Sequence, residues 1–372
     1  MYTISRIHAL IKPAMHGTFQ HHVDACEADK YRKKFSCYDL LVAMLFAVFS
    51  DSKSLRILEQ RFNAHPTGHY HLRTRAIHRS TLADALAQKI ITPFITFAQS
   101  LMQSADRKLR REGKTLLYLL DSTTIDLRGR GFDDWTRPNH NSSGVKLHLK
   151  MEHGGKCPVE ASLSHTNVND LDAGKAMSIE AGNTYVFDKG YCDYNWWHKI
   201  DAAFEEIGEN AVCGEHILSD RKIRCKHKKV SGKKQQNHYH DKVLRRIEVA
   251  REEGRTLVLV TNDHESSAAE IADNYKKRWQ IELLFKWMKQ HLALERPYSR
   301  TENGVRLHIV CVLIAYLLLR QAQREERETG SLHLYLAKIS GSLFERPETT
   351  YAHYRRRRER RGCAAQEEFA LF

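Results

Sequence analysis

The stretch Tyr275-Lys-Lys-Arg278-Trp-Gln-Ile-Glu282-Leu-Leu-Phe-Lys-Trp-Met-Lys289 places a tyrosine, an arginine, a carboxylate and a lysine at steps of three, four and seven. On an α-helix, at about 100° per residue, these four side chains fall within an arc of about 60°. A neighbouring arc of about 100° collects the apolar residues, which are Ile281, Leu284, Phe285, Met288 and Leu292. The pattern therefore predicts a helix that is packed on one side and presents a phosphate-handling face on the next.

Glutamate and lysine seven residues apart also occur on ordinary solvated helix faces, so the stretch alone leaves its role open. Two upstream aspartates narrow the choice. Asp121 ends the apolar run Leu116-Leu-Tyr-Leu-Leu, and Asp188 ends the run Thr184-Tyr-Val-Phe. Each run predicts a buried strand whose last residue is a carboxylate at the sheet edge, and Gly190 permits a sharp turn after the second one. Together with Glu282, these carboxylates supply oxygen ligands for a pair of Mg²⁺ ions about 4 Å apart, the arrangement that assists phosphodiester cleavage.

Three sequence blocks carry a family resemblance. Asp121-Ser-Thr, Asp188-Lys-Gly-Tyr191 and the series Tyr275, Arg278, Glu282, Lys289 resemble the signature blocks of the insertion sequence 4 family of bacterial transposases. Further similar segments are Arg79-Ser-Thr-Leu-Ala-Asp84, Gly144-Val-Lys-Leu-His148 and Lys286-Trp-Met-Lys-Gln-His-Leu292. The resemblance extends from about Tyr31 to Leu343, and its fixed residue types at set steps make it specific.

The resemblance implies an α/β fold: a ribonuclease H-like mixed sheet with flanking helices, a β-rich insertion before the last catalytic carboxylate, and a helical N-terminal domain. It implies a DNA transposase of an insertion sequence that cuts the element ends and joins 3′ hydroxyls to target DNA. Asp121, Asp188 and Glu282 would be both the catalytic residues and the ligands of two Mg²⁺ ions, for which Mn²⁺ can substitute. The partners would be double-stranded DNA, as terminal inverted repeats and target, and a second copy of the chain in a homodimeric synaptic complex.

Several other side chains of the helix are candidates for DNA contact. Arg278 can bind a phosphate through its bidentate fork and Lys289 as a point charge, with Tyr275 beside them. Trp279 or Trp287 would stack on an unpaired base, since hairpins at transposon ends force a base out in family members. Core packing is the alternative for both, and for Trp287 neither interpretation prevails. A solvated or structural role is expected for the remaining polar residues near the blocks, which are Asp126, Asp133, Asp134, Asp193 and His165.

Two other classes of protein share parts of this pattern. A catalytically idle DNA-binding protein derived from a transposase is disfavoured by the complete carboxylate set, because a degraded copy tends to lose it first. A stand-alone structure-specific nuclease or ribonuclease H is disfavoured by the long insertion and the helical N-terminal region.

Composition favours a nucleic-acid partner. The chain has 372 residues, of which 42% are hydrophobic, enough for two or three domains with proper cores. Its 59 Lys and Arg against 45 Asp and Glu give a formal charge of +14, which suits a polyanion. Membrane binding is not expected: no amphipathic basic helix with a Trp or Leu face stands out, and the run Ile309–Leu319 is too short to span a bilayer and predicts a buried core helix.

Cysteine usage and the N-terminus indicate a reducing compartment. The eight cysteines include no CxxC pair, so neither a disulfide framework nor a four-cysteine zinc site is predicted. His227, His238 and His240 near Cys225 are interpreted as part of a solvated basic loop rather than a zinc site. The N-terminus has no signal-peptide core, and a cytoplasmic, nucleoid-associated location in a bacterium is expected.

Residues 1–110 are predicted to form a helical DNA-binding domain. Leu40–Phe46 is expected to be buried, and Thr81 with Asp84 predicts a capping box for a helix that runs toward Met102. The pattern resembles a helix-turn-helix, with a possible DNA-end reader in Arg73, Arg75 and Arg79. The alternative is a helical subdomain that only packs on the catalytic core.

The catalytic domain is assigned to residues 111–216 and 264–345. Strands are predicted at Leu116–Asp121, Val145–Met151, Val159–Thr166, Thr184–Asp188 and Ala211–Cys213, and helices at Ala173–Ala181 and Tyr194–Ile207. A β-rich insertion is assigned to residues 217–263, with strands at Val243–Ala250 and Thr256–Thr261.

Basic residues concentrate in the insertion and the tail. Residues 221–246 hold eleven Lys or Arg against one acid, Asp241, and this density predicts a grip on DNA backbone. The expected phosphate contacts are Lys226, Lys228, Lys229, Lys233 and Lys234. Residues 346–372 form a tail with Arg355–Arg358, Arg360 and Arg361, predicted to be flexible and to bind polyanions unspecifically.

Overall fold

The fold is described from a computed structural model, which describes residues 5–15, 17–31, 34–112, 116–136, 142–191, 204–210, 212, 214–225, 243–251 and 254–345. The chain forms two compact units. The first comprises Met1–Lys108, Thr124–Val145 and Phe285–Phe372, and the second comprises Leu109–Thr123 and Lys146–Leu284. The described residues of the expected segment 1–110 therefore fall almost entirely in the first unit.

The first unit is helical. Its N-terminal part holds α1 (Arg6–Met15), α2 (Thr18–Ala25), α3 (Cys37–Phe49), α4 (Leu55–Asn63), α5 (Pro66–His71), α6 (Arg79–Gln88) and most of α7 (Thr92–Glu112). Its C-terminal part holds the end of α12 (Trp279–His291), then α13 (Glu302–Glu325) and α14 (Leu332–Ser340). The α3 helix starts at a capping box, in which Ser36 and Asp39 each satisfy a backbone N–H group of the other, and the predicted segment Leu40–Phe46 is buried.

One apolar helix forms the centre of this unit. The α13 helix packs against α1, α3, α6 and α14, and its residues Ile309–Leu319 are buried, as the sequence predicts. By length and composition α13 is the one helix of the described residues that is able to cross a membrane, yet 78% of its apolar window is buried inside the protein. Burial on this scale is what a core helix requires.

The helix predicted from Thr81 toward Met102 is in fact two helices, so this prediction is wrong. The α6 helix begins at Arg79 without a side-chain cap, which places Thr81 inside it, and it ends at Gln88, because the next residue, Lys89, has an extended backbone. The α7 helix starts at Thr92, with Pro93 in its first turn. Proline is tolerated there because the first N–H groups of a helix have no intrahelical partner, whereas it would break the interior of one long helix.

The middle of the chain forms a four-stranded mixed sheet. Its strands are β1 (Leu117–Asp126), β2 (Gly144–Glu152), β3 (Cys157–His165) and β4 (Thr184–Phe187), in the order β3-β2-β1-β4. The β4 strand pairs in parallel with β1, after a crossover that includes α8 (Asp170–Ala176). An inner β1 flanked by β2 and a parallel β4, with α8 on the crossover to β4, is the strand order that the predicted ribonuclease H-like α/β fold requires.

The predicted strands of this sheet are found within one or two residues of their bounds, except for the end of β1, and the helix before β4 also differs from its prediction. The β1 strand continues past Asp121 to Asp126, because the β-branched Thr123, Thr124 and Ile125 favour an extended backbone. The helix predicted at Ala173–Ala181 instead spans Asp170–Ala176. Asn169 caps it by accepting a hydrogen bond from the backbone N–H of Leu171 (3.2 Å), and this cap fixes the earlier start.

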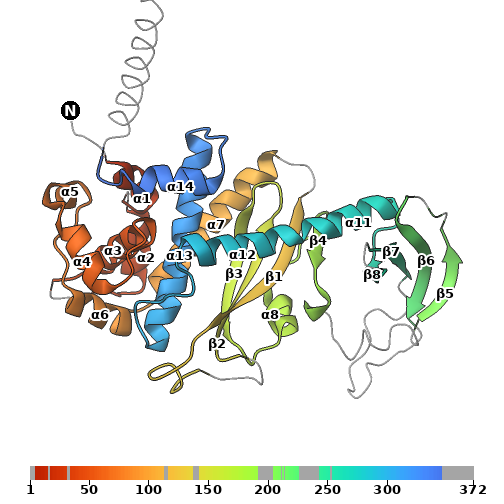
Figure 1. Ribbon diagram of the computed structural model, residues 1–372, viewed down its shortest axis with the longest axis horizontal. Coiled ribbons are helices and arrows are strands. Elements are labelled where there is room, and N and C mark those ends of the chain that lie inside the picture. The colour runs from red at the N-terminus through yellow and green to blue at the C-terminus, as the bar shows by residue number, and fades with distance from the viewer. Residues whose placement is uncertain are drawn as a thin grey trace, which may run out of the picture. The chain divides into compact units, whose positions relative to one another are not determined.

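A second four-stranded sheet forms the β-rich insertion. It comprises β5 (Phe204–Glu209), β6 (Ile217–Cys225), β7 (Val243–Ala250) and β8 (Thr256–Thr261), antiparallel in that order. Figure 1 shows α11 (Ala268–Lys277) beside this sheet, and Ile247, Val249 and Leu259 form a common apolar cluster with Ala268 and Ala272 of the helix. The predicted strands at Val243–Ala250 and Thr256–Thr261 are confirmed to the residue.

The prediction for the segment before this sheet is partly wrong. Residues 204–207, predicted as the end of a helix from Tyr194, lie in β5, so the β-rich sheet takes in residues before 217. The remainder of that predicted helix, and residues 211 and 213 of the predicted strand Ala211–Cys213, lie outside the described residues, as does the tail from 346.

Candidate active site

The pairing of β1 with β4 places two aspartates next to each other. The last pair in the register is Leu120 with Phe187, so Asp121 and Asp188 follow at the same level on neighbouring strands about 4.8 Å apart. Asp121 lies within β1 rather than at its end, but it is the first residue beyond the part that pairs with β4. The sequence prediction of a carboxylate pair at this edge of the sheet agrees with that placement.

A tight turn follows the second aspartate. Lys189–Tyr191 forms a 3₁₀ turn, and the backbone N–H of Tyr191 donates to the carbonyl oxygen of Asp188 (3.0 Å). The ring of Tyr191 is buried, which anchors the chain immediately after the carboxylate.

Arg278 links the first aspartate to the glutamate of the helix. Its Nη1 lies 3.2 Å from Oδ2 of Asp121, and its Nη2 lies 2.7 Å from Oε1 of Glu282. The helix predicted from Tyr275 to Lys289 is divided at this residue into α11 and α12, although Arg278 keeps helical dihedrals. Hydrogen bonds three residues apart, from Arg278 N–H to Tyr275 and from Ile281 N–H to Arg278, tighten the turn at the junction.

The carboxylate of Asp121 carries an unusual charge balance. Burial, with a smaller contribution from the nearby Glu282 and Asp188, raises its pKa to about 6, against the opposing Ser122 N–H group and Arg278. Burial lowers the pKa of Arg278, but the nearby carboxylate of Asp121, with Tyr275 and Glu282, outweighs burial and raises that pKa above its ordinary value. Two carboxylates, Asp121 and Glu282, therefore share one guanidinium, with Asp188 as a further negative charge near Asp121, and the site has surplus affinity for positive charge.

The other predicted residues of the helix have varied surroundings. The ring of Tyr275 lies 5.7 Å from the guanidinium carbon of Arg278 and packs on the apolar cluster of the insertion. Trp279 is 57% exposed. Lys289 donates to the carbonyl oxygen of Thr124 (3.0 Å) and pairs with Glu295 (2.7 Å). Trp287 packs edge-on to Tyr316 (5.7 Å), which favours core packing for this residue.

The remaining predicted contacts lie elsewhere or outside the described residues. Arg73, Arg75 and Arg79 are exposed between α5 and the first turn of α6. All five candidate lysines of the insertion, Lys226, Lys228, Lys229, Lys233 and Lys234, lie outside the described residues, as do Asp193, His227, His238 and His240. Asp126, Asp133 and Asp134 are exposed, and His165 is half-buried at the end of β3.

The sequence interpretation gave no role to three polar residues that surround Ser122. Asp170 accepts hydrogen bonds from Ser122 Oγ (2.9 Å) and from Lys146 Nζ (3.2 Å). His148 Nδ1 lies 3.6 Å from the same carboxylate oxygen. Lys146 and His148 belong to a block quoted for its family likeness, but Asp170, the first residue of α8, has no spacing signal in the sequence.

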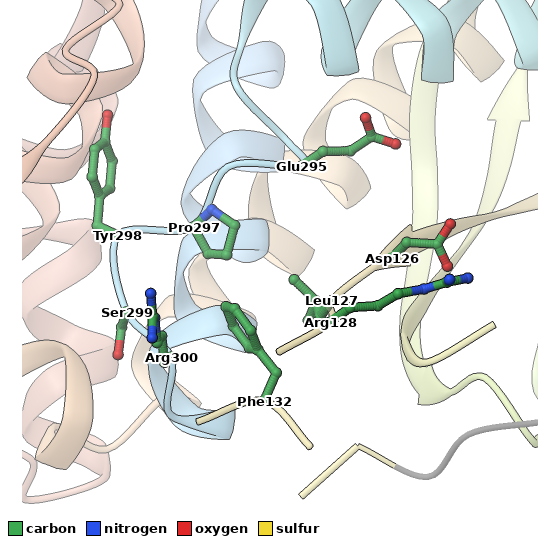
Figure 2. Close-up of a pocket in the computed structure, with 9 residues that line it drawn as sticks. All are labelled: Asp126, Leu127, Arg128, Phe132, Glu295, Pro297, Tyr298, Ser299 and Arg300. Carbon is green, nitrogen blue, oxygen red and sulfur yellow. The ribbon is translucent and has the colours of Figure 1, made fainter. Parts of the chain in front are cut away.

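A cleft of about 350 Å³ lies in the first unit, between the loop after β1 and the segment after α12 (Figure 2). Charged side chains of both signs line it, among them Asp126, Arg128 and Glu295, together with the ring of Phe132. A hydrogen bond from Trp135 Nε1 to the carbonyl oxygen of Arg300 (2.7 Å) joins the two segments. None of the three candidate carboxylates lines this cleft.

The donor chemistry at the carboxylates fits a hard divalent cation, which prefers carboxylate oxygens. In the described part of the chain no three Asp, Glu, His or Cys side chains stand close enough together to hold an ion. At Asp121 and Glu282 the guanidinium of Arg278 supplies the positive charge instead. Asp121, Asp188 and Glu282 fit a divalent cation because they supply carboxylate oxygens and because a cation would relieve the repulsion between their negative charges.

Residues 112–318 match the family model described as the transposase DDE domain, and residues 4–74 match a domain of unknown function, DUF4372. Protein y4zB of Sinorhizobium fredii, named as a transposase, is 37% identical over 276 residues, which cover 71% of this chain and 77% of y4zB. A Synechocystis protein named as the transposase of insertion sequence element IS4SA is 25% identical over 72% of this chain and 76% of its own length. Among solved structures, the piggyBac transposase synaptic complex with hairpin DNA covers 92% of this chain and 80% of its own, with a TM-score of 0.47 and 10% identity.

Proposed function

This chain belongs to the DDE transposase family, and on that premise we propose that Asp121, Asp188 and Glu282 are the carboxylates with which it cuts DNA. It is a DNA transposase of an insertion sequence, an enzyme of DNA cleavage and strand transfer. Element ends are cut and their 3′ hydroxyls are joined to target DNA.

The observation that carries the assignment is the register of β1 and β4. It sets Asp121 and Asp188 at one level of the sheet, and Arg278 connects Asp121 to Glu282. Burial and the neighbouring Glu282 and Asp188 raise the pKa of Asp121, and a carboxyl perturbed in this way beside other charged groups is a candidate for a functional site.

Members of this family use divalent metal ions. We infer that Asp121, Asp188 and Glu282 hold two Mg²⁺ ions, for which Mn²⁺ substitutes. Such a pair supplies charge neutralisation and activation of water for attack on the phosphodiester. The protein contributes the fixed spacing of Asp121 and Asp188 on paired strands, and Glu282 on a helix whose apolar side is buried.

The signature cations of the helix are proposed to bind DNA phosphates. Arg278 is half-buried with a planar fork suited to two phosphate oxygens, and Lys289 carries a point charge. Tyr275 lies beside Arg278 and buttresses it. The exposed ring of Trp279 is free of the core and fits base stacking.

Recognition of the transposon end is proposed for Arg73, Arg75 and Arg79, which are exposed ahead of α6. Deleting residues 1–110 would test this poorly, because α13 packs against α3 and α6 and would lose its cover. Substitution of the three arginines by glutamine keeps the fold and should reduce preference for the end sequence in competition gel shifts. Unchanged preference would assign end reading to another surface.

DNA is the partner of the protein, and its double-stranded forms are proposed to be the terminal inverted repeats and the target. The lysines of residues 226–234 are proposed to hold DNA backbone while two copies of the chain bring two ends together as a homodimer. A cytoplasmic, nucleoid-associated location follows from this proposal and from the net charge of +14.

A cleavage and joining assay tests the catalytic assignment. The substrate is a labelled duplex that carries the inverted repeat found beside the gene, with Mg²⁺ or Mn²⁺ and a plasmid target. Asp121→Asn, Asp188→Asn and Glu282→Gln should each reduce cleavage more than about a thousandfold, the scale expected when a catalytic group is removed. End binding should be retained. Asp273→Asn, an exposed residue of α11, is the control and should cleave normally.

Each outcome separates the candidate classes. Cleavage that survives one of the substitutions removes that residue from the active site. Specific end binding with no cleavage under any metal would identify an idle regulator, and cleavage without joining would identify a nuclease.

A further inference from the structure

We propose that Asp170 is a positioning residue for the two aspartates, because it accepts a hydrogen bond from the chain segment of Asp121 and lies close to the segment of Asp188. This inference rests on the proposed function, in which Asp121 and Asp188 are metal ligands. Asp170 is the first residue of α8, on the crossover between β3 and β4.

The first contact is with the segment of Asp121. Ser122 Oγ donates to Oδ1 of Asp170 (2.9 Å), while the backbone N–H of Ser122 donates to Oδ1 of Asp121 (2.8 Å). Ser122 therefore joins the two carboxylates, one through its side chain and one through its main chain. Moving Ser122 would redirect the carboxylate of Asp121.

The second contact is with the segment of Asp188. Oδ2 of Asp170 lies 3.9 Å from the position that a β-carbon on Gly190 would occupy, and Gly190 is in the 3₁₀ turn directly after Asp188. One turn later on α8, a β-carbon at Gly174 would come within 2.6 Å of Cδ1 of Tyr191. The helix thus lies close against the turn at two points.

The charge on Asp170 is balanced from the opposite side. Lys146 Nζ donates to Asp170 and to the carbonyl oxygen of Val168 (3.0 Å). His148 is fully buried, and burial lowers its pKa, so its ring is neutral at neutral pH. Lys146 is consequently the cation that fixes Asp170 in its orientation, with His148 packed beside it and bonded to Ser164 (2.8 Å).

A carboxylate in the first turn of a helix is also stabilising by itself, through the helix dipole. Asp172 provides the comparison, since it lies in the same first turn but is exposed. A dipole effect would be shared by both residues. Only Asp170 of the two accepts the hydrogen bond from Ser122 and lies close to the turn after Asp188.

The experiment measures Mn²⁺ binding to the full-length protein without DNA, by the electron spin resonance signal of free Mn²⁺, together with the Mn²⁺ concentration at half-maximal cleavage. Groups that orient metal ligands typically contribute about tenfold to a hundredfold in metal affinity. Asp170→Asn and Ser122→Ala should both weaken Mn²⁺ binding by about tenfold. Their effects should not add, because the serine acts in series with the aspartate.

The controls separate this inference from the assignment of the site. Asp172→Asn should bind Mn²⁺ like the wild type. If Asp121→Asn fails to weaken Mn²⁺ binding, the proposed catalytic assignment is wrong. If Asp121→Asn abolishes binding while Asp170→Asn and Ser122→Ala bind normally, the assignment stands and the positioning role of Asp170 is refuted. Ser122→Ala removes no charge, so it keeps the test valid should Asp170→Asn fold poorly.

Discussion

Two aspartate–arginine pairs in the second unit have opposite characters. In the insertion, Arg245 binds Asp220 through Nε (3.3 Å) and Nη2 (2.5 Å), and both side chains are almost fully buried, at 5% and 2% exposure. At the candidate active site, Arg278 and Asp121 are 14% and 17% exposed, and the arginine is shared with Glu282.

The first pair is satisfied. Arg245 Nη1 also donates to the carbonyl oxygens of Asp263 (3.0 Å) and Ser266 (2.6 Å), next to the residue that caps α11. Burial raises the pKa of Asp220, but hydrogen bonds from Arg245 and Asn210 outweigh it and hold the pKa below its ordinary value.

The second pair is left incomplete. Arg278 Nε is buried with no hydrogen-bond partner among the described residues, and the pKa of Asp121 is raised to about 6, chiefly by burial. The same two residue types therefore fasten the insertion sheet to α11 in one place and leave a site for cations and phosphates in another. The difference lies in the partners of the arginine: Arg245 binds one carboxylate and two carbonyl oxygens, whereas Arg278 is shared by two carboxylates.

The largest expected effect comes from breaking the satisfied pair. Arg245→Ala or Asp220→Ala leaves an uncompensated buried charge, which should lower the free energy of unfolding by about 3–5 kcal/mol. Urea denaturation followed by circular dichroism measures it. A double substitution to apolar residues, Asp220→Leu with Arg245→Met, should recover most of the loss. A loss below about 1 kcal/mol for either single variant would place this pair with surface ion pairs.

The second prediction has the opposite sign. A carboxyl whose folded pKa of about 6 exceeds its unfolded value favours the folded state when protonated, so its contribution to stability is lost as pH rises from 3.8 through 6. Asp121→Asn, a neutral isostere, should escape that loss. Without metal and at about pH 8, the free energy of unfolding of Asp121→Asn should be about 1–2 kcal/mol higher than that of the wild type, after allowance for partial solvent screening.

The pH series supplies the check. The advantage of Asp121→Asn should shrink when unfolding is measured at about pH 5, where the wild-type carboxyl is largely protonated. Exposed Asp133→Asn should show no such trend. A variant that is less stable than the wild type at about pH 8 would mean that Arg278 compensates Asp121 as fully as Arg245 compensates Asp220.

A third prediction concerns the arginine that the carboxylates share. Arg278→Gln removes a cation next to the proposed metal ligands. The repulsion between that cation and a bound metal ion would weaken metal binding by about 1 kcal/mol in a partly solvated site. Mn²⁺ binding without DNA should therefore tighten about fivefold, while DNA cleavage falls because the proposed phosphate ligand has been removed. Arg278→Lys keeps the charge and should bind Mn²⁺ like the wild type. Unchanged affinity in Arg278→Gln would show that the guanidinium does not compete with the ion.

The contrast between the two pairs also explains how far the sequence predicted this structure. Strand patterns of β-branched and apolar residues located β7 and β8 to the residue and the paired part of β1 closely, because alternation and burial are local signals. The placement of Asp121 and Asp188 followed from two strand ends, and that of Glu282 from helical spacing. These are the parts of the candidate site that short segments determine.

Features that depend on distant contacts were missed. The pairing of Asp170 with Ser122 spans 48 residues, and that of Arg245 with Asp220 spans 25, so no periodicity announces either. The junction at Arg278 was also missed, since its change of hydrogen-bond spacing keeps helical dihedrals and leaves the 3.6-residue pattern intact. Asn169 was overlooked as a cap because the apolar pattern of α8 is weak.

The smallest effect for each residue changed is expected from the lysines of the insertion, whose proposed partner is DNA rather than a protein carboxylate. Changing Lys226, Lys228, Lys229, Lys233 and Lys234 together to glutamine removes the positive charge opposite up to five phosphates. The slope of log affinity against log salt should then fall in magnitude by about 0.9 for each phosphate that is no longer neutralised. The ratio of specific to unspecific binding should hardly change, because lysines that bind phosphates position the duplex without reading its sequence, whereas paired-end complexes should become fewer. Lys30→Gln with Lys53→Gln is the control, since these half-exposed lysines already pair with Glu27 and Asp51, and it should leave the slope unaltered. A five-lysine variant with the wild-type slope and normal paired-end assembly would show that these lysines do not bind DNA. The cations that bind DNA would then have to lie elsewhere in the chain.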